Sequence, residues 1–305
     1  MTNRLFIFGL GYSARYLAQK CLGLGWNVSG TVRSSEKAAR LRAQGVQAHV
    51  FDGGEPSEDL LRDLHDAPHI LQSVGLVQGH DPILPTFGPW IGARPRVWVG
   101  YLSTTVVYGD HQGAWVDEET IPVPTTDRGK ARLAAESAWA QLPVPLHIFR
   151  LAGIYGPGRN LLTKILAGKS QTLVKEGQVF SRIHVADIGR LVFASMQHPA
   201  APMGPPAIYN GADDESAPPE DVAAYAAGLL GQAPPPLVPY DQAILSPMAR
   251  SFYADNKRVS NTKMRRLMGP LTHPTYREGL SDLFKTLDET SSHNPSLRAS
   301  HAGLP

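Results

Sequence analysis

The sequence of 305 residues has a single cysteine, Cys21, and no run approaching the ~18 to 20 apolar residues that a membrane-spanning helix needs. The lone cysteine excludes a disulfide framework and a cysteine-based zinc site, and it favours a reducing compartment. We therefore expect a soluble, cytoplasmic protein with no membrane partner. The first residues, MTNRLFIFGLGYSA, superficially resemble a secretion signal, although they also fit a strand and a glycine turn.

The chain also lacks an excess of charge of one sign. Its 29 Lys and Arg against 27 Asp and Glu give a formal charge of +2, so the overall charge does not favour nucleic acid or an anionic membrane as a partner. With 42% hydrophobic and 18% charged residues the composition excludes a disordered chain, and 29 Gly and 26 Pro predict many loops. At this length we expect one large α/β domain, or two that share an interface.

The first half of the chain alternates short apolar runs with segments of helical spacing. Strands are expected at 5–8, 27–32, 46–51, 70–74, 96–102 and 144–151, and helices at 14–24, 35–43 and 128–141. This alternation is typical of right-handed βαβ crossovers, and it predicts an α/β fold with a doubly wound, mostly parallel sheet.

After residue 151 the pattern changes, because Gly-Pro-Gly at 156–158 and two later proline clusters interrupt it. Helices are expected at 185–196, 220–230, 261–268 and 275–287. We expect a sheet domain over residues 1–155, to which later segments return, a smaller mixed substrate lobe over 156–287, and a flexible tail over 288–305.

A glycine motif, GLGYSA at 9–14, directly follows the first strand and opens the first helix. Gly9 permits a tight turn, Gly11 lets the backbone approach a pyrophosphate, and Ala14 allows close packing of helix on sheet. The helix N-terminus then offers N–H groups to the anion. The motif predicts a dinucleotide site; a glycine turn without a ligand is the alternative.

The end of the second strand lacks the acidic residue that NAD binders place against the ribose 2′-OH. Arg33 and Ser34 stand there instead, and a guanidinium beside hydroxyls could pair with a 2′-phosphate. NADP is therefore favoured over NAD, unless Arg33 is only a solvated loop residue. Asp52, which closes the third strand, would lie beside the adenine or simply form the turn of Asp-Gly-Gly.

Five further motifs together resemble the extended short-chain dehydrogenase/reductase superfamily, which includes NAD-dependent epimerases and dehydratases. They are LSTTVVYGD at 102–110, LAAE at 133–136, RLAGIYGPGR at 150–159, RIHVADI at 182–188 and NKRVSN at 256–261. The resemblance covers most of the chain and implies an NAD(P)-binding Rossmann fold with the substrate in the C-terminal lobe. Together with the glycine motif it predicts cofactor contacts from Gly9, Gly11, Tyr12, Ser13, Ala14, Arg33, Ser34, Asp52, Ser73, Val74 and Ile154.

The resemblance also implies a catalytic set. In this superfamily a Ser or Thr holds the substrate oxygen, a Tyr exchanges the proton, and a Lys four residues later lowers the pKa of the Tyr and binds the ribose. Thr104 matches the first position, but Arg128 stands at the Tyr position and Arg132 at the Lys position. Arginine is neither a useful acid nor a base near neutral pH, so the usual proton relay is absent. Lys130 cannot restore it, because two residues along a helix turn the side chain to the opposite face.

Two interpretations of the arginines stay open. They bind a carboxylate or phosphate or stabilise a developing oxyanion, or else they form an ion-paired helix face with Glu136 at i, i+4 and i+8. The missing proton could come from Tyr108, Tyr155 or His184, although each also has a structural explanation. Of these, Tyr155 follows the sixth strand, where the superfamily binds the nicotinamide.

The sequence thus predicts an atypical NAD(P)-dependent oxidoreductase or epimerase/dehydratase that acts on a small polar substrate, anionic if the arginines bind it. The alternative is a non-catalytic protein that senses NADP(H) and signals to a partner. The resemblance further implies a homodimer, since members of the superfamily often pair through a helix such as the one at 128–141. No metal site is expected, because His111, His147, His198 and His273 are too scattered along the chain.

Overall fold

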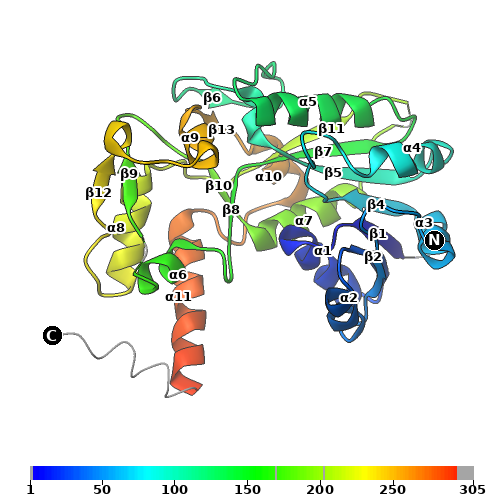
Figure 1. Ribbon diagram of the computed structural model, residues 1–305, viewed down its shortest axis with the longest axis horizontal. Helices are drawn as coiled ribbons and strands as arrows, with labels where there is room; N and C mark the ends of the chain where they lie inside the picture. The colour runs from blue at the N-terminus through cyan, green and yellow to red at the C-terminus, as the bar shows by residue number, and fades with distance from the viewer. Residues whose placement is uncertain (1–2, 169, 202, 294–305) are drawn as a thin grey trace.

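One parallel sheet organises the molecule. The computed structural model describes residues 3–168, 170–201 and 203–293, and its central sheet has seven strands in the order β11-β7-β5-β4-β1-β2-β3 (Figure 1). These are β1 (Arg4–Phe8), β2 (Asn27–Val32), β3 (Gln47–Val50), β4 (His69–Gln72), β5 (Trp98–Thr104), β7 (Leu146–Leu151) and β11 (Ala207–Gly211). From β1 the chain moves outward on both sides, so the predicted doubly wound α/β fold is confirmed.

The six predicted strands are all present, but the seventh strand of the sheet, β11, was not predicted. It pairs in parallel with β7, from Ala207 opposite His147 to Gly211 opposite Leu151. Its sequence, AIYNG, follows a proline cluster and contains a polar residue, Asn210, that is fully buried. A five-residue segment of this composition has no apolar run that periodicity could detect.

Helices connect the strands and cover both faces of the sheet. They are α1 (Tyr12–Gly23), α2 (Ser35–Arg42), α3 (Glu58–Asp66), α4 (Leu84–Gly92), α5 (Asp127–Trp139) and α7 (Val185–Met196). The sequence did not predict α3 or α4. In α3 the Ser57 hydroxyl accepts the Leu60 N–H, and Leu60 and Leu64 are buried one turn apart. In α4 two prolines and two glycines conceal the helical period, and Pro89 lies inside the helix.

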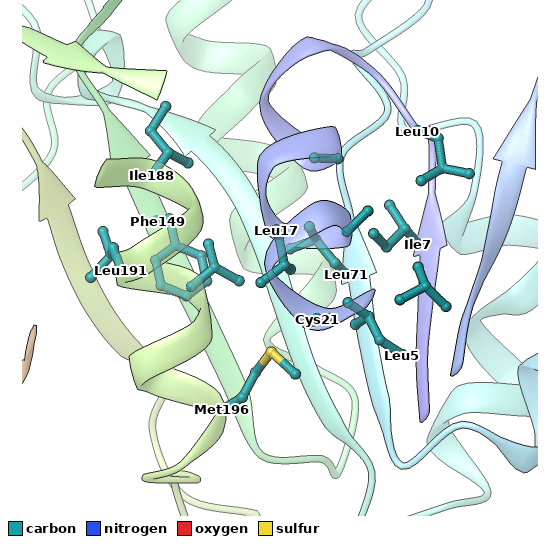
Figure 2. Packing of buried hydrophobic residues seen from close by; sticks show 14 of the residues in the cluster. Leu5, Ile7, Leu10, Leu17, Cys21, Leu71, Phe149, Ile188, Leu191 and Met196 are labelled. Carbon is teal, nitrogen blue, oxygen red and sulfur yellow. The ribbon is translucent and has the colours of Figure 1, made fainter. Parts of the chain in front are cut away.

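Alternate residues of β1 supply the two halves of the core, because successive side chains of a strand point to opposite faces. Leu5 and Ile7 pack with α1 and α7 in the cluster of Figure 2. Phe6 and Phe8 pack on the other face, in the cluster that includes residues of α3, α4 and α5. The sheet is therefore buried on both sides, as a parallel sheet requires.

A smaller lobe lies at one end of the sheet, on the left of Figure 1. It contains three two-stranded parallel sheets and is filled by a separate hydrophobic cluster from α6, α8 and α11. Its strands and their partners are β6 (Trp115–Val116) with β13 (Arg258–Val259), β8 (Gly153–Tyr155) with β10 (Arg182–His184), and β9 (Thr172–Val174) with β12 (Leu237–Pro239). The remaining helices are α6 (Leu161–Leu166), α8 (Pro219–Leu229), α9 (Pro247–Tyr253), α10 (Thr262–Met268) and α11 (Tyr276–His293), with short 3₁₀ turns η1 (Thr105–Tyr108) and η2 (Tyr240–Gln242).

Segments far apart in the sequence join the lobe to the sheet. The β6–β13 pairing connects Trp115 and Val116 to Arg258 and Val259, and α7, β11 and α10 all pack within the sheet layers. The helix α11 continues to His293, so the first part of the expected tail at 288–305 is helical, and residues 294–305 lie outside the described residues. No helix in the described part of the chain combines the length and the hydropathy needed to cross a membrane.

Candidate functional site

The turn between β1 and α1 is the first element of the site. Gly9 has a φ of +78°, and a Cβ added there would lie 2.8 Å from Val74 Cγ2. Its N–H donates to Thr31 Oγ1 at 2.9 Å, which fixes the turn against β2. Gly11 is the N-cap of α1, where no side chain of the described residues caps the helix. The N–H groups of the first turn are therefore open to an anion.

A cleft of about 390 Å³ lies beside this turn. It brings together six of the predicted cofactor residues, Gly9, Gly11, Arg33, Asp52, Ser73 and Val74. Asp52 also accepts the Gly54 N–H at 3.3 Å, so it both forms the turn and lines the cleft. Ser34 caps α2 by accepting the Lys37 N–H at 3.3 Å.

Tyr12 and Ser13, the other predicted residues of the motif, lie in the first turn of α1. The Tyr12 hydroxyl donates to the Pro157 carbonyl at 3.1 Å, and the Arg159 guanidinium lies 5.8 Å from the Tyr12 ring centroid. Tyr12 thus connects α1 to the loop that follows β8. Ala14 is buried in the core beneath the turn.

Positive charge gathers where β2 ends. Arg33 and Lys37 both line the cleft, and burial together with the charges of Arg15, Arg33 and Arg40 lowers the pKa of Lys37. Among the described residues no carboxylate forms an ion pair with Arg33 or Lys37. Lys37 was not predicted as a cofactor residue, although it stands only four residues after Arg33.

A second cavity, of about 460 Å³, lies between the carboxyl ends of β5 and β7 and the smaller lobe. Three predicted residues line it, Thr104, Ile154 and Tyr155. Thr104 Oγ1 accepts the Val106 N–H at 3.4 Å at the start of η1. The lobe contributes the opposite wall, from β10, α9 and the segment that leads to β13.

The two arginines of α5 lie near each other, as their spacing predicts. The Arg128 guanidinium carbon lies 4.5 Å from the centroid of the Phe252 ring, and Phe252 lines the second cavity. Arg132 Nη1 donates to the Tyr101 hydroxyl at 2.8 Å. Burial, and then the charge of Arg132, lowers the pKa of Arg128. Both guanidinium groups are held by aromatic side chains, and neither has a carboxylate partner among the described residues.

The alternative interpretation, in which Arg128, Arg132 and Glu136 form an ion-paired helix face, is therefore wrong. Glu136 turns from α5 toward the sheet, where Arg150 of β7 donates to Glu136 Oε2 at 2.8 Å and the Ser103 hydroxyl donates to Oε1 at 2.5 Å. Lys130 lies on the exposed side of the first turn of α5, 3.7 Å from Asp127. Lys130 points away from the site, as the helical period predicts.

The three other candidates for proton transfer are engaged in the interior. The Tyr108 hydroxyl is fully buried and donates to Asn210 Oδ1 at 2.7 Å. The Tyr155 hydroxyl donates to the Thr275 carbonyl at 3.3 Å and packs so closely on α11 that a Cβ at Gly279 would overlap it. Burial raises the pKa of Tyr155. Tyr155 lines the cavity, but its hydroxyl belongs to the packing of the lobe.

His184 likewise has a structural role. Its Nδ1 accepts the Ala186 N–H at 3.4 Å and so caps α7. The centroid of its ring lies 3.7 Å from the centroid of the His273 ring. Burial, followed by the nearby His273, lowers the pKa of His184 to about 4. The imidazole is therefore neutral at physiological pH.

Comparisons with known proteins agree with this architecture. No family model matches the chain. The protein YeeZ of Escherichia coli K12 is 27% identical over 212 residues, which are 65% of this chain and 74% of YeeZ. A functionally unknown conserved protein from Silicibacter pomeroyi DSS is 47% identical with a TM-score of 0.84, covering 94% of this chain and all of that one. A proposed NAD-dependent epimerase/dehydratase from Methylobacillus flagellatus is 25% identical with a TM-score of 0.71, over 94% of this chain and 100% of its own.

Solved structures that the chain matches include NAD-dependent epimerases and dehydratases, in agreement with the resemblance of its motifs to the extended short-chain dehydrogenase/reductase superfamily. More distant structures share the fold, such as the UDP-glucuronic acid 4-epimerase of Bacillus cereus in complex with UDP-glucuronic acid and NAD. That enzyme is 18% identical with a TM-score of 0.71, and the match covers 93% of this chain and 99% of the epimerase. The shared fold does not by itself assign Arg128 and Arg132 to the Tyr and Lys positions, so that assignment stays a prediction from the sequence motifs.

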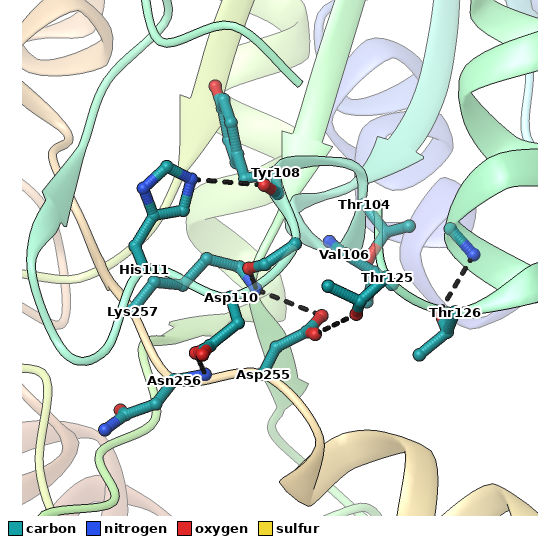
Figure 3. A network of polar contacts seen from close by, with 12 residues as sticks. Thr104, Val106, Tyr108, Asp110, His111, Thr125, Thr126, Asp255, Asn256 and Lys257 are labelled. Atoms are coloured by element: carbon teal, nitrogen blue, oxygen red, sulfur yellow. Dashed lines mark hydrogen bonds and ion pairs between the residues drawn. The ribbon is translucent and has the colours of Figure 1, made fainter. Parts of the chain in front are cut away.

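The structure adds a lysine to the site. Lys257 lines the second cavity, donates to the Gly109 carbonyl at 2.7 Å and lies 3.4 Å from Asp255 Oδ2 (Figure 3). The Thr125 hydroxyl donates to the other oxygen of Asp255. Burial lowers the pKa of Lys257, and Asp255 opposes this effect. The sequence showed Lys257 only as part of the NKRVSN match, because the Gly109 carbonyl that accepts from it lies more than a hundred residues away.

Proposed function

We propose that the protein is an NADP(H)-dependent oxidoreductase or epimerase/dehydratase-like enzyme that acts on a small polar, anionic substrate. The observation that carries the cofactor part is the pair of cations, Arg33 and Lys37, in the wall of the cleft beside the glycine turn. The substrate would occupy the second cavity, where Thr104 and Ile154 face the smaller lobe.

The residues of the cleft fit a dinucleotide. A Cβ placed on Gly11 would meet only the Gly9 carbonyl oxygen, at 3.7 Å, so the space before the uncapped helix is open to a pyrophosphate. Ser73 and Val74 would flank the cofactor, and Arg33 and Lys37 would hold a 2′-phosphate through charge-assisted hydrogen bonds. The related B. cereus epimerase is in complex with NAD, which supports a nicotinamide dinucleotide here.

The residues around the second cavity would bind and orient the substrate. A nicotinamide cofactor, when bound, supplies a hydride acceptor or donor. The Thr104 hydroxyl would hold the substrate oxygen, and Arg132, at the Lys position, would donate to the ribose hydroxyls. Arg128, held over Phe252, would attract negative charge toward the cavity. Lys257 would hold the exchangeable proton at Nζ, because Lys257 lines the cavity and burial lowers its pKa.

The test is a fluorescence titration of the purified protein with NADPH and NADH at matched salt. Wild type should bind NADPH more tightly than NADH, and Arg33→Ala or Lys37→Ala should weaken NADPH about tenfold or more while leaving NADH unchanged. Arg62→Ala is the matched control, since Arg62 is an exposed arginine of α3 that pairs with Asp59. If NADPH and NADH bind with equal affinity and no variant changes either affinity, the proposed preference for NADP is refuted. If neither nucleotide binds, the enzyme interpretation has to be abandoned for a scaffold or partner-binding role.

A second candidate function, a non-catalytic NADP(H) sensor, is favoured by one observation. Arg128 replaces the phenol at the Tyr position, and the hydroxyls of Tyr108 and Tyr155 are engaged elsewhere. A sensor would bind NADPH but would leave it unoxidised in the presence of a panel of small carbonyl acids. Oxidation of bound NADPH by any member of the panel, lost in Thr104→Val, would favour the enzyme.

A further inference from the structure

The segment between β4 and α4, residues 73–83, forms one wall of the cleft beside the glycine turn. Residues 73–77 and 82–83 line the cleft. Val74 packs on the turn itself, because a Cβ added to Gly9 would lie 2.8 Å from Val74 Cγ2. Apart from one isolated bridge this wall segment has no regular secondary structure. Its shape therefore depends on side chains that bind its backbone.

The Asp81 carboxylate lies at the centre of these contacts. Its Oδ1 accepts the N–H groups of Ile83 at 2.8 Å and Leu84 at 3.0 Å, where α4 begins. Its Oδ2 accepts from Gln72 Nε2 at 3.0 Å and from Trp139 Nε1 at 2.9 Å. No lysine or arginine of the described residues forms an ion pair with Asp81. Hydrogen bonds from strand, helix and backbone thus take the place of a counter-ion.

Gln72 transmits this hold to the part of the wall that meets the glycine turn. The side chain of Gln72 is fully buried, and its Oε1 accepts the Val74 N–H at 2.7 Å. Because Asp81 accepts from the amide nitrogen, it also determines that the amide oxygen points to Val74. A chain of hydrogen bonds therefore runs from Asp81 through Gln72 to Val74, whose nitrogen would lie 3.2 Å from a Cβ on Gly9.

The helix α5 anchors the wall segment at two points. One is Trp139, which is fully buried and whose ring centroid lies 5.9 Å from that of Tyr101, the residue that accepts from Arg132. The other is the tip of the segment, where a Cβ added to Gly79 would lie 3.8 Å from the Cβ of Ala131. The wall is thus fixed relative to the helix that carries Arg132.

We propose that Asp81 is a positioning residue for the cofactor, which preforms the wall of the cleft by joining it to α5. The inference rests on the proposed function, because it takes the occupant of the cleft to be a nicotinamide dinucleotide. A wall that is already ordered lowers the entropy cost of binding. Asp81 acts through Gln72 and Trp139 and needs no contact of its own with the nucleotide.

Two measurements on the full chain test this role. They are amide hydrogen exchange of residues 73–83 without nucleotide, and fluorescence titration with NADPH. Asp81→Asn keeps the size of the side chain, but its amide cannot accept from all four donors. Exchange in the wall segment should become about tenfold faster, and the Kd for NADPH should rise about tenfold. Asp59→Asn is the matched control, since Asp59 is an exposed residue of α3 that pairs with Arg62, and it should change neither value.

A rescue variant separates positioning from a general loss of packing. In Gln72→Glu/Asp81→Asn the new carboxylate can accept from the new amide and from the Val74 N–H. This double variant should recover part of both losses, and no recovery would overturn the proposal. Should Asp81→Asn not fold, Trp139→Phe decides, because it removes one donor and keeps an aromatic ring. It should raise the exchange rate and the Kd by a smaller factor, and no change in either would refute the role of Asp81.

The outcomes also separate this inference from the proposed function. If the wild type binds NADPH and Asp81→Asn leaves its Kd unchanged, the proposed function stands and the positioning role falls, whatever the exchange rate. If the wild type binds neither NADPH nor NADH, the proposed function falls and the cofactor role of Asp81 falls with it. Faster exchange in Asp81→Asn would then still show that Asp81 holds the wall segment.

Discussion

Glu136 of α5 and Arg150 of β7 form an ion pair in which both Nε and Nη2 of Arg150 donate to the Glu136 carboxylate. The pair is buried beneath the candidate site, and each side chain is only 4% exposed. Arg150 also lies 4.9 Å from the centroid of the Tyr108 ring. The pair fixes the rotation of α5 relative to β5 and β7, because Glu136 cannot leave the sheet without exposing Arg150 to an apolar environment. One and two turns earlier on the same helix are Arg132 and Arg128, so the pair positions both arginines.

Glu136→Gln should therefore destabilise the protein strongly. Loss of one partner of a buried pair leaves the other charge uncompensated, which costs about 3–5 kcal/mol. The free energy of unfolding from urea denaturation measures the effect. Asp66→Asn is the matched control, since it breaks the half-exposed pair with Arg4 and should cost at most about 1 kcal/mol. Equal losses in the two variants would contradict the role given to Glu136.

The sheet could be predicted because each of six strands is an apolar run bounded by turn residues, and the glycine motif marks the first crossover. The prediction missed what tertiary contacts determine. β11 is a strand because β7 offers an edge to Ala207–Gly211, and α4 is a helix despite Pro89 because Phe87 and Ile91 are buried in the core. The helical period put Glu136 on the face of the arginines, but it could not show that Arg150 lies opposite.

The cofactor half of the site was easier to predict than the substrate half for the same reason. Gly9, Gly11 and Arg33 lie within one βαβ unit, where local spacing decides proximity. The substrate cavity joins Thr104 to residues such as Arg182 and Lys257, which the lobe brings from far along the chain. No local pattern marks a lysine whose partner is the carbonyl of Gly109.

Gly109→Ala should disturb the loop whose carbonyl accepts the hydrogen bond from Lys257. Gly109 has φ +76° and ψ −155°, a region that is essentially restricted to glycine, and a Cβ there would overlap the Val123 carbonyl oxygen. Gly269 is the matched control, because it has φ +77° and ψ −161° but nothing within 4 Å of an added Cβ. Gly269→Ala should cost about 1–3 kcal/mol from backbone strain, and Gly109→Ala should cost clearly more. Urea denaturation of the two variants tests this, and a smaller loss for Gly109→Ala would refute the steric argument.

Arg132→Leu should weaken NADPH binding, since Arg132 would donate to the ribose from the Lys position. We expect the Kd from fluorescence titration to rise about tenfold, the loss of one charge-assisted hydrogen bond. Tyr101→Phe should have a smaller effect in the same direction, because it removes only the hydroxyl that accepts from Arg132 Nη1. Lys130→Leu, two residues away on the exposed face, should leave the Kd unchanged. If Lys130→Leu weakens binding as much as Arg132→Leu does, general attraction to positive charge explains the result.

Mild acid should destabilise the protein through His147, a fully buried residue of β7. Its Nε2 accepts the Ala200 N–H at 2.9 Å, which only the neutral ring can do. Burial, and then the charge of Lys263, lowers the pKa of His147 from 6.5 to about 4. The unfolded chain therefore takes up the proton first, so the stabilisation is complete above about pH 6.5 and declines as the pH falls toward 4. His184 has a similar pKa and should add to the decline. We expect His147 to contribute a loss on the order of 2–3 kcal/mol over this range.

The variant His147→Phe isolates that contribution. It should flatten the dependence of the urea midpoint on pH between 7 and 5, whatever its effect on stability at pH 7. His65→Gln, which changes an exposed histidine at the end of α3, should keep the full dependence. A wild type and a His147→Phe variant that lose stability in parallel would assign the acid sensitivity to other groups, because a buried imidazole with a lowered pKa must contribute to it.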